Sequence, residues 1–397
     1  MVYFFVFIFL LLFSYIEFRK TLFYQRRFLE VISAFFLIIL AGFRFETGGD
    51  WPEYTGLFNK IETIDELISG RYIYFSDINM EVGYKLLNSI IKSMGGNVQW
   101  IFFIVSLFSI ILIFISLKKY IENTNLGLLV YYCTMFFIVD MILVRQNIAI
   151  AIFFYSIQYI KSRSFLKYLG CCIIGALFHL TAIFLIPIYF IVRVHLARKI
   201  YILLFVCFNC VLIFQIMWLT SFLPSIIESI TGVFVADKLV FYLTEKTYAV
   251  ARGFSLGLLS NMVIFILLIS NFKRMEFKPY FIIFFNLFLI NIFVFSCLFE
   301  FIEISNRMRL YFFLSLSVLF PMLVYSFHRK TNRLFFFICI VLISFSFSHK
   351  IFLENPIAIA YNPYQNYLIH ILFDTKSDGK ERLDKSGDMF INNRIEQ

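Results

Sequence analysis

Long apolar runs are the feature that most limits what this chain can fold into. A helix needs about 20 mainly apolar residues to cross roughly 30 Å of hydrocarbon. Windows of comparable length recur near residues 2–18, 28–43, 99–117, 126–143, 147–160, 200–219, 254–270, 280–298, 310–327 and 334–348. Since 61% of the residues are hydrophobic and 15% are charged, a water-soluble fold would leave large apolar patches exposed. The sequence predicts an all-α polytopic membrane protein with about ten transmembrane helices. It excludes a soluble enzyme, a disordered chain and a nucleic-acid-binding protein.

The basic residues predict the orientation of these spans, because Lys and Arg of short loops gather on the cytoplasmic side of a membrane. Six clusters near 19–27, 118–119, 161–167, 193–199, 273–278 and 329–333 hold 18 of the 35 basic residues. All six lie on one side only if the apolar run 168–192 enters and leaves by the same face. One full span there would reverse everything downstream. We therefore favour a re-entrant or short helical hairpin near 168–192, with both termini outside.

This orientation gives a single integral membrane domain over residues 1–373. Its outer loops are expected at about 44–97, 220–253, 299–309 and 349–373. Residues 374–397 are charged and poor in apolar side chains, so a disordered tail is predicted there. The seven cysteines all lie inside apolar stretches, where they are typical of small core residues. Neither a metal site nor a cofactor is predicted.

The first outer loop begins with charged residues directly after a span. Arg44, Glu46 and Asp50 lie within seven positions of one another. Gly48 and Gly49 let the backbone turn, so that these charged groups converge near the membrane surface. An interfacial anchor with solvated charges and belt aromatics explains the same pattern. Spacing alone leaves both interpretations open.

The next candidate rests on a length argument. Residues 126–160 hold two crossings, so Asp140, Arg145 and Gln146 must lie at or below the outer surface. An arginine at such a depth is costly unless it is paired or functional. Pairing of Arg145 with Asp140 is the structural interpretation. Bidentate binding of a phosphate is the functional one, and the two are evenly matched.

Three further groups have both a chemical and a structural interpretation. His179 lies near the middle of the predicted hairpin and is either a base or a hydrogen-bonded core group. Arg307 and Arg309, placed on a turn, either face a diphosphate together or only flank a span. Tyr361 and Tyr364 either stack on sugar rings or anchor the chain at the interface.

Six short segments follow one another along nearly the whole chain: RFETGGDWPEY (44–54), EVGY (81–84), Arg145-Gln146 with Ile148-Ala149, His179 with Thr181 and Pro187, NRMRLY (306–311) and YNPY (361–364). Together they resemble the EpsG family of Wzy-type bacterial polysaccharide polymerases. Each motif is weak by itself, whereas the ordered set is fairly specific. The chain departs from the pattern by carrying Gly-Gly-Asp where many relatives carry Gly-Thr-Asp.

The resemblance implies a GT-C-like fold and an enzyme of the bacterial cytoplasmic membrane whose site faces the periplasm or the outside. Such an enzyme transfers a glycan on undecaprenyl diphosphate to a new lipid-linked repeat unit, building O-antigen, capsule or exopolysaccharide. Cations must stabilise the leaving diphosphate, and the acceptor hydroxyl needs a base. The candidate substrate-binding residues are Arg44, Arg145, Gln146, Arg307, Arg309, Tyr361 and Tyr364. The candidate catalytic residues are Asp50, Glu46, Glu81 and His179.

Catalysis is expected to be metal-independent, because no DxD-like metal motif precedes a nucleotide site in the sequence and the implied donor is not a nucleotide sugar. The expected partners are the lipid-linked oligosaccharide and membrane lipid, with a chain-length regulator and a flippase as further candidates. A flippase or transporter of lipid-linked sugars is the leading alternative function. An O-antigen ligase is another alternative.

Overall fold

A computed structural model describes residues 1–19, 23–71, 73–78, 80–220, 253, 255–351, 353 and 356–395. Within them the chain is helical, and Arg44 and Asn366 form an isolated β-bridge. The all-α class predicted from the sequence is therefore confirmed. Nearly all of the predicted outer loop 220–253 lies outside the described residues. The chain divides into two compact units, Met1–Pro187 with Arg329–Gln397, and Ile188–His328.

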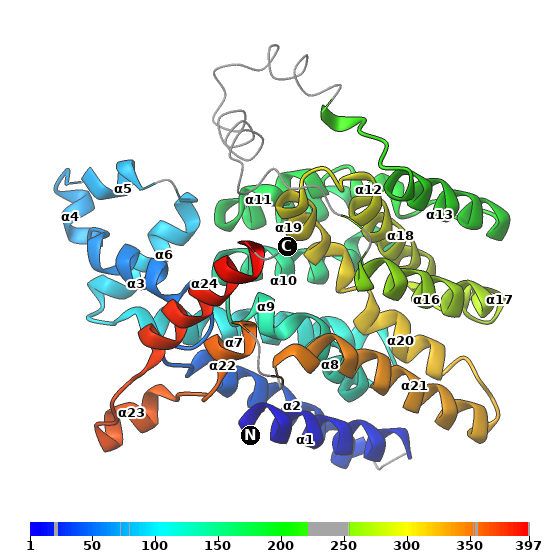
Figure 1. The fold of residues 1–397 in the computed structure, drawn as a ribbon, viewed down its shortest axis with the longest axis horizontal. Coiled ribbons are helices and arrows are strands. Elements are labelled where there is room, and N and C mark those ends of the chain that lie inside the picture. The colour runs from blue at the N-terminus through cyan, green and yellow to red at the C-terminus, as the bar shows by residue number, and fades with distance from the viewer. Residues whose placement is uncertain are drawn as a thin grey trace. The chain divides into compact units, whose positions relative to one another are not determined.

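The first unit holds most of the helices (Figure 1). They are α1 (Val2–Phe18), α2 (Phe23–Gly42), α3 (Trp51–Lys60), α4 (Ile64–Ile68), α5 (Ile73–Asp77), α6 (Val82–Ser93), α7 (Val98–Tyr120), α8 (Thr124–Tyr131), the π-helix η1 (Tyr132–Phe136), α9 (Phe137–Val139), α10 (Val144–Lys161), α11 (Phe165–Phe178), the 3₁₀-helix η2 (Leu180–Leu185), α21 (Lys330–Ser348), the 3₁₀-helix η3 (His349–Ile351), α22 (Pro356–Tyr361), α23 (Tyr367–Phe373) and α24 (Gly379–Ile395). Helices α3 and α4 of the predicted first outer loop both pack on α6.

The second unit is built around α18. Its helices are α12 (Ile188–Ile191), α13 (Arg198–Ile213), α16 (Leu256–Ser270), α17 (Phe272–Met275), α18 (Phe281–Cys297), α19 (Ile302–Phe313) and α20 (Leu316–Val324). Helix α18 contacts α13, α19 and α20, and 14 of its 17 residues are buried. Its apolar side chains therefore form the centre of this unit.

Among the described helices, α7 and α21 are each long and apolar enough to cross a membrane. Helices α19 and α20, bent by 41° at their junction, would make a third span. Shorter apolar helices of 10–17 residues, such as α1 and α18, accompany them. This set is consistent with a multi-pass membrane protein, although fewer helices reach full spanning length than the ten that the sequence predicts. One reason is that the helices end earlier than the predicted windows do: α8, η1 and α9 run continuously over Thr124–Val139, whereas the window extends to residue 143.

Residues 168–185 form a hairpin that reverses direction at His179. His179 has extended backbone angles, between the end of α11 and the start of η2. The Tyr168 hydroxyl donates to the Leu185 carbonyl at 2.6 Å. A Cβ placed on Gly175 would lie 3.2 Å from the Ala182 Cβ. The two arms are thus in close contact, as the distribution of basic residues predicts.

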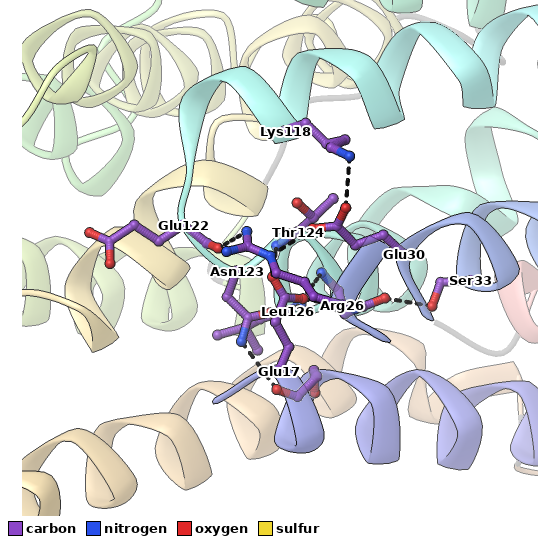
Figure 2. Close-up of polar contacts among 11 residues, drawn as sticks. Glu17, Arg26, Glu30, Ser33, Lys118, Glu122, Asn123, Thr124 and Leu126 are labelled. Atoms are coloured by element: carbon purple, nitrogen blue, oxygen red, sulfur yellow. Dashed lines mark hydrogen bonds and ion pairs between the residues drawn. The ribbon is translucent and has the colours of Figure 1, made fainter. Parts of the chain in front are cut away.

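A polar network joins α1, α2, α7 and α8 at one end of the first unit (Figure 2). The Glu17 carboxylate accepts from the first two amide N–H groups of α8, Thr124 at 3.1 Å and Asn125 at 3.0 Å. Arg26 Nε lies 2.9 Å from Glu17 and 3.0 Å from Glu30. Lys118 Nζ lies 2.8 Å from the other Glu30 oxygen. Basic residues that the sequence assigns only to orientation therefore also bind buried carboxylates.

The C-terminal segment packs on the start of the predicted first outer loop. The Phe45 amide donates to the Gln365 carbonyl at 2.9 Å, and the Tyr367 amide donates to Phe43 at 2.8 Å. The predicted disordered tail contains α24, which packs on α22. Arg382 of α24 donates to the Ala360 carbonyl at 3.4 Å. This hydrogen bond and the burial of the Arg382 side chain hold a polar helix against the rest of the unit.

Candidate functional site

An ion pair between Arg145 and Glu81 is the centre of the candidate site. Arg145 lies in the first turn of α10, and Glu81 is the residue that precedes α6. Arg145 Nη1 lies 2.5 Å from Glu81 Oε2. The second Glu81 oxygen accepts from the Leu180 amide of the hairpin at 3.4 Å. One carboxylate therefore links the predicted outer loop, α10 and the hairpin turn.

Asp140 does not form the ion pair with Arg145 that the structural interpretation assumes. One Asp140 oxygen accepts from Asn147 Nδ2 at 3.0 Å, and the other accepts from the Tyr131 hydroxyl. These partners lie on the helices before and after the turn, so Asp140 fixes the geometry of the α9–α10 connection. Arg145 is left to Glu81, 64 residues earlier in the chain, and sequence spacing gave no sign of this pairing.

The approach of α6 to α11 brings Glu81 to the hairpin, and Gly83 permits that approach. A Cβ on Gly83 would lie 2.7 Å from the Leu177 carbonyl oxygen and 2.9 Å from the Leu177 Cβ. Real Cβ contacts essentially never occur at such distances, so a side chain here would force the two helices apart. The EVGY motif therefore contains both the carboxylate and the residue that lets it reach its partners.

Replacing Gly83 with alanine is expected to destabilise the protein by about 1–3 kcal/mol, because overpacking shifts the backbone. The Gly56→Ala variant is the matched control, since a Cβ at Gly56 of α3 meets nothing within 4 Å. It should be neutral or stabilising by up to about 1 kcal/mol. Thermal unfolding of both purified variants in detergent checks the difference. Equal stability of the two would contradict the close approach of α6 and α11.

Two buried tyrosines, Tyr54 and Tyr84, stand beside the ion pair. Their ring centroids are 5.7 Å apart in an edge-to-face arrangement, and Tyr54 is hydrogen-bonded to Arg145. Burial raises the pKa of Tyr54, although the Arg145 charge opposes the shift, and burial also raises the pKa of Tyr84. Both phenols therefore stay protonated at neutral pH. One of the two sequence interpretations of this loop counts Tyr54 among the interfacial aromatic residues, and neither includes its contact with the arginine.

The charged loop 43–50 packs against the turn that precedes α10. Gly48 has a φ of +95°, and a Cβ there would lie 2.6 Å from the Met141 carbonyl oxygen. A positive φ and such a close approach both require glycine. The backbone turn predicted at this glycine pair is confirmed at Gly48. It places Asp50, half-buried at the N-terminus of α3, next to the segment that carries Arg145.

Arg44 lies inside the first unit and is only 2% exposed. Its Nη1 donates to the Ala41 carbonyl at 2.8 Å, and its guanidinium carbon lies 4.3 Å from the Phe102 ring centre. Its charge acts on Asp140 and on Tyr54. From the sequence, Arg44 is expected to bind a substrate phosphate, but a side chain so enclosed cannot contact one directly. Arg44 instead supplies a buried positive charge that interacts with Tyr54 and Asp140.

The remaining acidic candidate and the histidine already have protein partners. Glu46 has a positive φ of 43° and accepts a hydrogen bond from the Ser377 hydroxyl. His179 is 8% exposed, and its Nδ1 lies 2.6 Å from the Thr181 hydroxyl. Gln146 is also buried, directly after Arg145. Asp50 differs from Glu46 in its position, because it lies half-buried at the N-terminus of α3.

Tyr361 and Tyr364 are both held by hydrogen bonds from their hydroxyl groups to the backbone of other segments. Tyr361 is 2% exposed, and its hydroxyl donates to the Phe137 carbonyl. The Tyr364 hydroxyl donates to the Leu40 carbonyl at 3.0 Å. Both rings also form edge contacts with Tyr3 of α1. They tie the C-terminal segment to the helices. The Tyr361 ring is too enclosed to stack on a sugar, whereas Tyr364 is half-buried and its sugar contact stays a prediction.

Arg307 and Arg309 lie in the second unit, where they project from different sides of one helix. Both are in α19, where residues two apart project about 200° from each other around the axis. Arg309 Nε donates to Asn291 at 3.1 Å, and its guanidinium lies 4.4 Å from the Phe295 ring centre. The expectation that both arginines face one diphosphate from a turn is wrong, because the segment is helical.

In the described part of the chain, no group of three or more His, Cys, Asp or Glu side chains could hold a metal ion. Comparison with protein families gives one match, in which the model of the EpsG family covers residues 27–366. Neither the curated proteins nor the solved structures contain a significant match. The matched range includes every candidate residue of the first unit. Ser377, which donates a hydrogen bond to Glu46, lies beyond it.

Proposed function

Since the chain belongs to the EpsG family of polysaccharide-synthesis membrane proteins, we propose that it is the polymerase of such a pathway. The proposed reaction transfers a growing glycan from undecaprenyl diphosphate to a new lipid-linked repeat unit. The bond between the anomeric carbon and the diphosphate oxygen breaks, and a bond from that carbon to the acceptor hydroxyl forms. The acceptor proton passes to a base, and undecaprenyl diphosphate leaves.

The observation that carries this proposal is the Arg145–Glu81 ion pair beside Tyr54. A guanidinium near a water-poor surface can stabilise negative charge that develops on a leaving diphosphate. Side-chain exposure of 19% for Arg145 leaves part of it accessible to a ligand, in contrast to Arg44. The Tyr54 and Glu81 contacts hold the guanidinium in one orientation, so little reorganisation is needed during the reaction.

Asp50 is the proposed base for the acceptor hydroxyl. It is half-buried at the start of α3 and its charge acts on Tyr54, which places it in the same part of the unit as Arg145. Glu81 is less suited to this role, because ion pairing with Arg145 favours its charged form and weakens it as a base. We place the site on the outer face of the cytoplasmic membrane, where a polyprenyl diphosphate presents its reactive bond.

Deletion of the gene followed by examination of the surface glycan tests the proposal. A polymerase predicts that single repeat units are still exported, with polymer restored by the wild-type gene. Loss of all surface sugar, with lipid-linked repeats retained inside, would identify a flippase instead. Free polymer that is never attached to its final acceptor would identify a ligase. Asp50→Asn complementation should fail to restore polymer at a normal protein level.

A further inference from the structure

A cavity of about 300 Å³ lies between the ends of α7 and α10, away from the candidate polymerase site. Its lining is Ile115, Ser116, Lys118, Lys119, Tyr120, Tyr155 and Gln158. This volume is at the small end of the range for ligand pockets. The sequence predicts that this end of α7 is cytoplasmic, because the two lysines form one of the basic clusters.

The charge of the cavity comes mainly from Lys119. Lys118 is bound to Glu30, and Arg26 lies between Glu30 and Glu17, so these two cations and two anions balance. Lys119 Nζ instead donates to the neutral Gln158 side-chain oxygen at 2.5 Å. That contact orients the ammonium at the cavity without neutralising it. The remaining positive charge favours an anionic group.

An apolar stripe on α7 leads to this charge. Phe108, Ile111 and Ile115 are all exposed, although α7 is otherwise about half buried. Positions 108, 111, 115 and 119 share one face of a helix because they are three or four residues apart. The stripe forms the lipid-facing side of α7, a helix of 23 residues, and it ends at the cavity. An acyl chain along the stripe would bring its own headgroup to Lys119.

We propose that this cavity and stripe bind one anionic phospholipid of the bilayer, with its phosphate at Lys119 and an acyl chain along Phe108, Ile111 and Ile115. Charge complementarity selects the anionic headgroup, and the apolar stripe selects a lipid over a soluble phosphate. Basic pockets between membrane helices on the cytoplasmic side bind such headgroups. This site does not depend on the proposed polymerase activity, since it lies on other residues.

Native mass spectrometry of the full chain, released from nanodiscs of phosphatidylglycerol and phosphatidylcholine, tests the proposal. The wild type should retain phosphatidylglycerol in preference to phosphatidylcholine. Lys119→Gln should lower this retention about fivefold, the loss of one lysine near a charged headgroup. Lys119→Arg should preserve it. Lys330→Gln is the matched control, since Lys330 is an exposed lysine of another basic cluster, and it should have no effect.

Three results would overturn the proposal. One is equal retention of the two lipids by the wild type. Another is unchanged retention of phosphatidylglycerol by Lys119→Gln. The third is displacement of the bound lipid by inorganic phosphate, which would identify a soluble anion site instead. Ile115→Ser tests the stripe separately and should weaken retention, whereas Ile338→Ser on the exposed face of α21 should not.

Discussion

Arg145→Ala is expected to reduce polymer formation by about 10²–10³-fold, the usual loss when a group that stabilises transition-state charge is removed. Arg145→Lys should recover little of this activity, because an ammonium cannot reproduce the forked contacts of a guanidinium. The chain length of surface glycan, measured by gel electrophoresis in a deletion strain, gives the readout. Protein level in the membrane must be measured in parallel.

The control for this substitution is Arg27→Ala, because Arg27 is an exposed arginine of α2. Its loss should leave polymer length unchanged. If Arg27→Ala shortened the polymer as much as Arg145→Ala, the effect would reflect loss of positive charge in general. Polymer of normal length in the Arg145→Ala strain would remove this arginine from the reaction.

A charge swap separates a catalytic role of Arg145 from a structural one. Arg145→Glu with Glu81→Arg restores two opposite charges at these positions but removes the acceptor of the Leu180 amide, so the membrane level of the double variant is measured beside that of the wild type. The cation then sits before α6 and no longer on α10. A guanidinium that only holds the fold together would function from either side, and the double variant would make polymer. A guanidinium that meets the diphosphate would not, and we expect no polymer.

The sequence was sufficient to predict the fold class and the hairpin, and the reason is physical. The length of an apolar segment decides whether it can span a membrane, and basic residues of short loops stay on the cytoplasmic side. Both properties can be taken from the sequence alone. The positions at which helices end or bend cannot be predicted from these two properties. The window 310–327 looks like one span, yet a bend of 41° between α19 and α20 lies within it, and the helix in the window 126–143 ends at Val139. Such breaks depend on packing partners that a hydropathy window does not contain.

The candidate site shows the same limit at the level of single residues. Sequence reasoning singled out Arg145 because an arginine near a span is unusual, whereas Glu81 was named only through the family resemblance. One of the two interpretations of Arg145 paired it with Asp140, five positions away, but the structure pairs it with Glu81. Proximity in sequence is a poor guide to partners when helices bring distant segments together. Gly83, two positions after Glu81, permits the close contact of α6 with α11, and this role was not predicted from the sequence.

The buried network around Glu17 provides the second large expected effect. Glu17 is 2% exposed and accepts from the Thr124 and Asn125 amides as well as from Asn125 Nδ2 at 2.8 Å. Helix α8 starts there, and the amide groups of a first helical turn have no partners within the helix. A carboxylate at this position satisfies them and complements the helix dipole.

Glu17→Ala is therefore expected to destabilise the protein by about 2–4 kcal/mol, from two orphaned amide donors and the loss of a helix cap. The ion pair with Arg26 adds less, because that arginine is 37% exposed and solvent screens its charge. Glu122→Ala is the matched control. Glu122 has an exposed side chain, and the group that accepts from Arg26 is its main-chain carbonyl, which alanine retains. The control should stay within about 0.5 kcal/mol of the wild type, as measured by thermal unfolding in detergent. If Glu17→Ala were no less stable than Glu122→Ala, the capping of α8 by α1 would not contribute to the fold.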